Sequence, residues 1–111
     1  MKLLMHGMRQ LRDQEAFLAE QIHGKTFPTF PEGYTALLEE LQEAQDEVRR
    51  VECSAQIILR LMREPNPRTQ EEMEKLLDDM EHRSLLAACE LVQTAYVAGK
   101  MIRSMEGWNH D

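Results

Sequence analysis

The sequence predicts an all-α protein built on a long antiparallel helical hairpin. Three observations lead to this fold class. Glu, Leu, Ala, Met, Gln and Arg dominate the composition, and all six favour helices. Apolar residues recur at heptad spacing through two long stretches. No segment shows the two-residue alternation that is typical of a strand. A chain of 111 residues has the length of one domain, so residues 1–111 are predicted to form a single helical domain.

The N-terminal segment, residues 1–23, is predicted to form a helix. Its apolar residues recur at the spacing of one helix face. Gly24 follows the segment, and glycine commonly ends helices because it accepts a left-handed conformation. This helix is expected to pack on the hairpin. Its recurring apolar residues are Leu4, Met8, Leu11, Leu18 and Ile22.

Residues 24–31 are predicted to form an extended strap. Two prolines push the residues that precede them out of helical dihedral angles. The apolar residues Phe27 and Phe30 are expected to hold the strap against the core. The spacing of a capping box, a Thr followed three residues later by a Glu, occurs at residues 29–32 and again at residues 69–72. Both positions are predicted helix starts.

Two long helices, at about residues 31–63 and 69–106, are predicted to form the hairpin. Residues 64–68 contain two prolines and are the expected turn, and residues 107–111 are a short tail. Each buried Leu, Ile or Met contributes about 1.5–3 kcal/mol, so the apolar seams of the two helices are expected to pack together. The seam of the first hairpin helix consists of Tyr34, Leu37, Leu41, Ala44, Val48, Val51, Ala55, Ile58 and Met62.

The C-terminal half of the second hairpin helix is apolar on nearly all sides. A helix of this kind is covered on more than one side, and the first hairpin helix covers one of them. Any side that stays uncovered would form an interaction surface. The candidate residues for this surface are Leu85, Val92, Tyr96 and Gly99.

The net charge of −7 argues against nonspecific binding to nucleic acid or to an anionic membrane. Acidic residues are concentrated in the first half of each hairpin helix, as the helix macrodipole favours. This structural explanation and an acidic face that mimics a nucleic-acid duplex both remain open. The candidate acidic residues are Glu39, Glu40, Glu43, Glu47, Asp78 and Asp79.

No pattern in the chain predicts catalysis, and we expect neither an enzyme nor a cofactor. The alternative to an interaction module is a metal-binding structural module on the second hairpin helix. Asp79 and His82 have the i, i+3 spacing of carboxylate metal sites, and His82 shares a helix face with Cys89. These three residues are weak candidates for metal ligands, because carboxylate sites of this kind need the acidic–His pair twice.

The two cysteines, Cys53 and Cys89, do not have the pattern of a disulfide framework. The first residues become polar too soon for a signal peptide. No uninterrupted apolar run approaches about 18 residues, so no membrane-spanning segment is expected. These features predict a cytoplasmic protein with reduced thiols.

Three stretches of the chain resemble a known group of proteins. They are residues 22–25 (IHGK), 33–38 (GYTALL) and 95–102 (AYVAGKMI). They are similar to a family of short helical-hairpin proteins of unknown function from Firmicutes and their phages or mobile elements, and the likeness covers about residues 15–106. The resemblance implies a bacterial or phage origin and a helical hairpin. The family has no established site residues, so none is transferred to this chain.

Together these observations predict a non-enzymatic protein-interaction module. The partner is expected to be another protein of unknown identity, or a second copy in a homodimer. Direct binding to nucleic acid or to a membrane is not expected. A finer hypothesis is a phage or mobile-element inhibitor of a bacterial defence nuclease, of the anti-CRISPR kind, that acts through helical or acidic surfaces.

Overall fold

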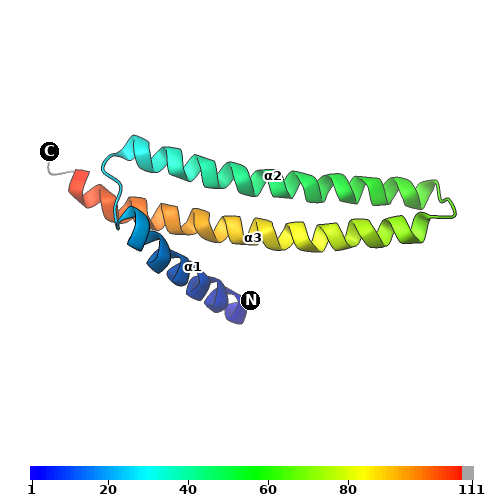
Figure 1. Ribbon diagram of the computed structural model, residues 1–111, viewed down its shortest axis with the longest axis horizontal. Helices are drawn as coiled ribbons and strands as arrows, with labels where there is room; N and C mark the ends of the chain where they lie inside the picture. The colour runs from blue at the N-terminus through cyan, green and yellow to red at the C-terminus, as the bar shows by residue number, and fades with distance from the viewer. Residues whose placement is uncertain (109–111) are drawn as a thin grey trace. The chain divides into compact units, whose positions relative to one another are not determined.

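The protein is all-α, as the sequence predicts (Figure 1). A computed structural model describes residues 1–108, apart from the side chains of Ile22 and His23. These residues contain no strand. The second and third helices form an antiparallel hairpin and the first packs on the third, which confirms the predicted arrangement. The helices are α1 (Lys2–His23), α2 (Phe30–Arg63) and α3 (Thr69–Trp108).

Both hairpin helices differ slightly from their predicted bounds. α2 starts one residue early, at Phe30, and α3 continues past Gly107 to Trp108. The indole N–H of Trp108 donates a hydrogen bond to the carbonyl oxygen of Phe27 at 3.1 Å, which anchors the last turn of the helix. Residues 109–111, the rest of the predicted tail, lie outside the described residues.

Two compact units make up the chain. Unit 1 comprises Met1–Gln42 and Glu90–Asp111, so it contains α1, the start of α2 and the end of α3. Unit 2 comprises Glu43–Cys89 and contains the rest of α2, the turn and the start of α3. Each unit has buried residues of its own.

The core of unit 1 consists of Tyr96, Val97 and Met101 on α3. Alanines of α1 and apolar residues of the strap and of α2 pack against these side chains. Because alanine is short, it lets one helix approach another closely. An ion pair between Arg103 and Glu20, at 3.2 Å, also joins α3 to α1. The residues that pack against the core are Ala16, Ala19, Phe27, Ala36 and Leu37.

Hydrogen bonds attach the strap to the last turns of α3. The N–H of Phe27 donates to the hydroxyl of Ser104 at 2.7 Å, and this hydroxyl donates to the carbonyl oxygen of Lys100 at 2.7 Å. At the start of the strap, Gly24 has a φ of 82°, and its N–H donates to the carbonyl oxygen of Glu20 at 3.1 Å. Gly24 therefore ends α1, as predicted.

The two predicted capping boxes behave differently. The N–H of Glu32 donates to Oγ1 of Thr29 at 3.4 Å, so Thr29 caps α2 as predicted. α3 starts at Thr69 as predicted, but the capping hydrogen bond differs, because Oγ1 of Thr69 accepts from the N–H of Asn66 at 2.6 Å. Asn66 in turn accepts from the N–H of Arg68 at 2.7 Å. The threonine hydroxyl thus stabilises the turn rather than the helix start.

The residues that unit 2 buries most completely have small side chains. Its most buried residues are Ala44, Ser54 and Ala87. Larger apolar residues of the same helices keep much of their surface in water: Val48, a predicted seam residue, is 42% exposed and Leu77 is 53% exposed. The helices of unit 2 therefore bury their small residues most completely.

Against the expectation from the sequence, α3 is long and apolar enough to cross a membrane by length and composition alone. It contains an 18-residue window with a mean hydropathy of 1.3. Charged residues interrupt the apolar runs of α3, so no single run is long enough to cross a membrane. The average hydropathy over a window can still be high, because it tolerates isolated charged residues. One third of the window (33%) is buried inside the protein. A core helix can have the same composition, so this property does not by itself indicate a membrane.

Candidate functional site

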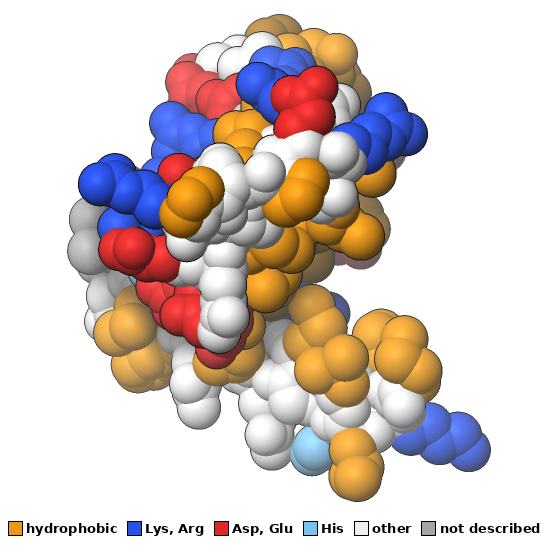
Figure 2. Space-filling view, turned by 90° about the vertical axis from the view of Figure 1, so that its right-hand side faces the viewer, with side chains coloured by type: hydrophobic (Ala, Val, Ile, Leu, Met, Phe, Trp, Pro, Cys, Tyr) orange, Lys and Arg blue, Asp and Glu red, His pale blue; other side chains and the backbone are white. Residues whose placement is uncertain are grey.

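Unit 1 carries a row of exposed apolar side chains along α1. Leu4, Leu11 and Leu18 lie seven residues apart on one side of the helix and are 60%, 51% and 60% exposed. Leu3 and Phe17 are exposed as well. Hydrophobic side chains gather along α1 in the lower part of Figure 2. We call these five residues the α1 apolar face, and solvent can reach all of them.

α1 packs on the hairpin as predicted, but its recurring leucines Leu4, Leu11 and Leu18 stay exposed. α1 instead packs against the α3 core with Ala16 and Ala19. Both sides of the helix have helical spacing and apolar residues, so the pattern alone does not show which side is covered. The contact with α3 selects the side with short side chains.

The structure separates the four residues that the sequence suggested as an interaction surface. Val92 and Tyr96 are buried, so they are not accessible to a partner. Gly99 is partly buried and lines a hollow of about 240 Å³ together with Tyr96 and Arg103. Leu85, in unit 2, is 63% exposed. Of these four residues, only Leu85 presents a largely exposed side chain.

The candidate acidic residues of unit 2 differ in their surroundings. Arg83 forms ion pairs with Glu47 at 3.3 Å and with Asp79 at 3.4 Å. The hydroxyl of Ser54, which is buried, donates to Asp79 at 3.4 Å. Asp78 and Glu43 are exposed. Glu47 and Asp79 thus take part in contacts within the hairpin, which partly neutralises the face that the sequence suggested.

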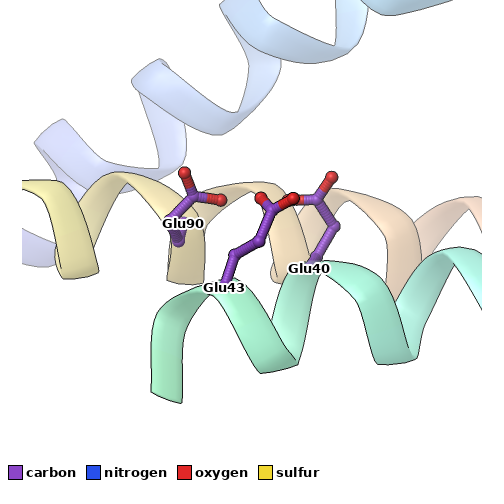
Figure 3. Close-up of side chains that lie close together, drawn as sticks. All are labelled: Glu40, Glu43 and Glu90. Carbon is purple, nitrogen blue, oxygen red and sulfur yellow. The ribbon is translucent and has the colours of Figure 1, made fainter. Parts of the chain in front are cut away.

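Two glutamates of unit 1 lie close together, Glu40 on α2 and Glu90 on α3 (Figure 3). Their carboxylate oxygens are within 4.8 Å of each other, and both residues are partly buried. Glu39, beside Glu40, is exposed. The sequence did not single out Glu90, although an isolated acidic residue within an apolar stretch was the available signal.

Within the described part of the chain, the three candidate metal ligands do not come together as a ligand set. His82 and Cys89 are both exposed. Among the described residues, neither belongs to a group of three or more side chains close enough to share a metal ion. Asp79, the third candidate, interacts with Arg83 and Ser54. The geometry therefore does not favour a site built from these three residues.

A cavity of about 560 Å³ opens in unit 1 between the three helices and the strap. Its floor includes Tyr96, Val97 and Lys100, which are all buried. The ammonium of Lys100 lies 4.3 Å from the centre of the Phe27 ring, in a cation–π contact. The sequence did not identify Lys100 as a site residue. The available signal was a lysine one helical turn after Tyr96 in an otherwise apolar stretch.

Burial shifts the ionisation of both polar groups on the cavity floor. Removal from water lowers the pKa of Lys100, an effect that nearby Glu20 partly offsets and Arg103 reinforces. Burial also raises the pKa of Tyr96, and Glu20 adds to this increase. The floor of the cavity therefore disfavours charge more than an exposed surface does.

No protein family, curated protein or solved structure matches this chain. The resemblance to short helical-hairpin proteins stays a prediction. The function therefore has to be inferred from two features of unit 1, the α1 apolar face and the cavity around Lys100.

Proposed function

We propose that this protein is a non-enzymatic interaction module that binds another protein through the α1 apolar face. The observation that carries the proposal is the exposure of Leu4, Leu11 and Leu18 along one side of α1. Each such side chain contributes about 1.5–3 kcal/mol when a partner covers it. Apolar grooves of other proteins recognise amphipathic helices through anchors of this helical spacing.

The acidic surfaces support the proposal in a secondary role. Glu39, Glu43 and Asp78 are exposed carboxylates, and exposed charges increase the rate of association with a basic partner more than the affinity. Arg83 partly neutralises Glu47 and Asp79. We therefore assign the affinity to the apolar face rather than to the acidic residues.

A finer proposal is that the partner is a bacterial defence nuclease, which the protein inhibits in the cytoplasm. The small size, the acidity and the helical fold motivate it. A cleavage assay with several purified effector nucleases and an excess of this protein tests it. Unchanged cleavage by all of these nucleases would contradict the finer proposal, but it would not affect the proposal that the α1 apolar face is a binding surface.

The general proposal is tested with a triple variant, Leu4→Ser, Leu11→Ser and Leu18→Ser. We first identify the proteins that bind to the immobilised wild type but not to this variant. Each of them is then purified and titrated against the wild type and against the triple variant. We expect the variant to weaken binding at least about 100-fold, because three leucines that would be covered are removed. Circular dichroism confirms that the helices remain.

The matched control is Leu77→Ser with Leu85→Ser, which removes exposed leucines of unit 2. The control is expected to bind like the wild type. A purified partner that binds the triple variant and the wild type equally would show that the α1 apolar face is not the binding surface.

A further inference from the structure

The cavity in unit 1 buries a lysine. The side chain of Lys100 is only 4% exposed, and lysine is almost never buried to this degree unless its charge is paired. The contact recorded for its ammonium is with the face of the Phe27 ring. An aromatic ring attracts the charge, but the three N–H donors of an ammonium prefer oxygen acceptors. The carboxylate of Glu20 is near enough to raise the pKa of Lys100, but its ion pair among the described residues is with Arg103.

A second buried polar group lies one helical turn away on the same face of α3. The residue Tyr96 is 8% exposed, and its hydroxyl has no hydrogen-bond partner among the described residues. A buried polar group without a partner costs about 1–3 kcal/mol. Both Tyr96 and Lys100 line the cavity, so one bound molecule with oxygen acceptors could contact both.

The rest of the cavity changes in character from the floor to the rim. Phe27, Ala36 and Val97 supply apolar walls. Three glutamates line the cavity as well: Glu15 and Glu39 are exposed, and Glu40 is partly buried. A volume of about 560 Å³ lies within the range of small-molecule sites. The cavity thus combines a buried cation, an apolar middle and an acidic rim.

We propose that this cavity is a binding site for a small molecule with a carboxylate on an apolar body. The carboxylate accepts hydrogen bonds from Lys100 and Tyr96, and the apolar body packs against Phe27. If the molecule also carries an ammonium group, Glu39 and Glu15 at the rim attract it. The acidic rim excludes molecules with several negative charges.

Three indole compounds of similar shape test the charge pattern by calorimetric titration of the full chain at neutral pH. Tryptophan has both a carboxylate and an ammonium, indole-3-propionate has only the carboxylate, and tryptamine has only the ammonium. We expect tryptophan and indole-3-propionate to bind at least about tenfold more tightly than tryptamine, because a charge-assisted hydrogen bond at the floor is lost with the carboxylate. Tighter binding of tryptophan than of indole-3-propionate would identify a zwitterion as the preferred ligand.

Three variants locate the carboxylate. Lys100→Met is expected to reduce the affinity for both carboxylate probes about tenfold or more, and Tyr96→Phe about threefold to tenfold. Lys75→Met removes an exposed lysine of unit 2 and is expected to leave the affinities unchanged. In the wild type, we expect the probes to shift the amide NMR signals of Phe27 and Val97. This measurement does not depend on whether any variant folds.

The proposal is wrong if neither carboxylate probe binds saturably at millimolar concentration, or if tryptamine binds as tightly as they do. It is also wrong if a folded Lys100→Met variant keeps the wild-type affinity. NMR shifts confined to the α1 apolar face would instead assign the probes to that surface and would equally contradict the cavity as their site.

Discussion

The two units of the chain are stabilised by contacts of different range. In unit 1, the hydrogen bond between Phe27 and Ser104 connects residues that are 77 positions apart in the sequence. In unit 2, the ion pair between Arg83 and Glu47 connects residues only 36 positions apart. Contacts between residues that are close in sequence require less loop-closure entropy. We therefore expect the hairpin of unit 2 to form before unit 1 closes.

The two units also bury different residues. Unit 2 buries small side chains most completely, such as Ala44 and Ala87, and its contacts from Arg83 to Glu47 and from Ser54 to Asp79 are partly buried. Unit 1 buries larger residues, including Tyr96, Met101 and the charged Lys100. Residues from the three helices and the strap of unit 1 line a cavity of about 560 Å³.

The largest effect is expected for Met101→Ala, which truncates the core of unit 1. A large-to-small change at a buried methionine costs about 2–5 kcal/mol. Trp108 is the only tryptophan and belongs to unit 1, so its fluorescence reports that unit, while circular dichroism reports all helices. In urea, the fluorescence transition should shift to lower concentration. Leu77→Ala, at an exposed position of unit 2, is the control and should cost below about 1 kcal/mol.

If the fluorescence and circular dichroism transitions of Met101→Ala shift to the same urea concentration, the two units unfold as one. A fluorescence shift without a matching shift in circular dichroism would show that unit 2 is stable without unit 1. An unchanged fluorescence transition would contradict the assignment of Met101 to the core.

Each unit contains a buried serine whose hydroxyl forms hydrogen bonds, and the stability that each serine contributes is expected to differ. Ser104→Ala removes the acceptor of the Phe27 N–H, which lies at 2.7 Å, and should lower the free energy of unfolding by about 1–3 kcal/mol. Ser54→Ala removes a longer bond of 3.4 Å to Asp79 and should cost less. Hydrogen exchange at the Phe27 amide should accelerate only in Ser104→Ala. Equal costs for both variants would contradict the special role of the strap.

Two glycines are expected to respond to alanine with opposite signs. A Cβ at Gly33 would lie 2.9 Å from Cγ of Met101 and 3.1 Å from Phe27, so Gly33→Ala should destabilise unit 1 by about 1–3 kcal/mol through overpacking. A Cβ at Gly7 in α1 meets nothing within 4 Å. Gly7→Ala should therefore stabilise the protein by about 0.5–1 kcal/mol. Thermal unfolding of both variants checks the signs, and a stabilising Gly33→Ala would show that Met101 moves away easily.

The smallest effect concerns the dependence of stability on pH. Burial lowers the pKa of Lys100 below its ordinary value of 10.5. Just below pH 10.5 the unfolded chain therefore binds more protons than the folded chain, and this contribution to stability rises with pH. The wild type should therefore gain stability relative to Lys100→Met as the pH rises towards 10.5. Tyr96, whose pKa burial raises, acts in the opposite direction but is present in both proteins. A difference that does not change with pH would contradict the shifted pKa of Lys100.

The sequence predicted the helices well, but it did not predict which side chains are buried. Heptad spacing, Gly24 and the prolines act on the local backbone, so the hairpin, the end of α1 and the strap could all be predicted. The helix start at Thr69 was predicted correctly, but its hydroxyl binds the N–H of Asn66 in the turn, an alternative that the capping-box spacing does not exclude. Lys100 was missed because its burial depends on Phe27, a residue far away in the sequence.

By itself, then, the sequence determined the all-α class, the hairpin and the strap, because helix periodicity and helix ends depend on residues a few positions apart. Only the tertiary structure decided which side of α1 is covered and which polar groups are buried. Ala16 and Ala19 face the core while Leu4, Leu11 and Leu18 stay in water. The physical reason is that burial depends on which surfaces meet, and in unit 1 these surfaces come from segments separated by most of the chain.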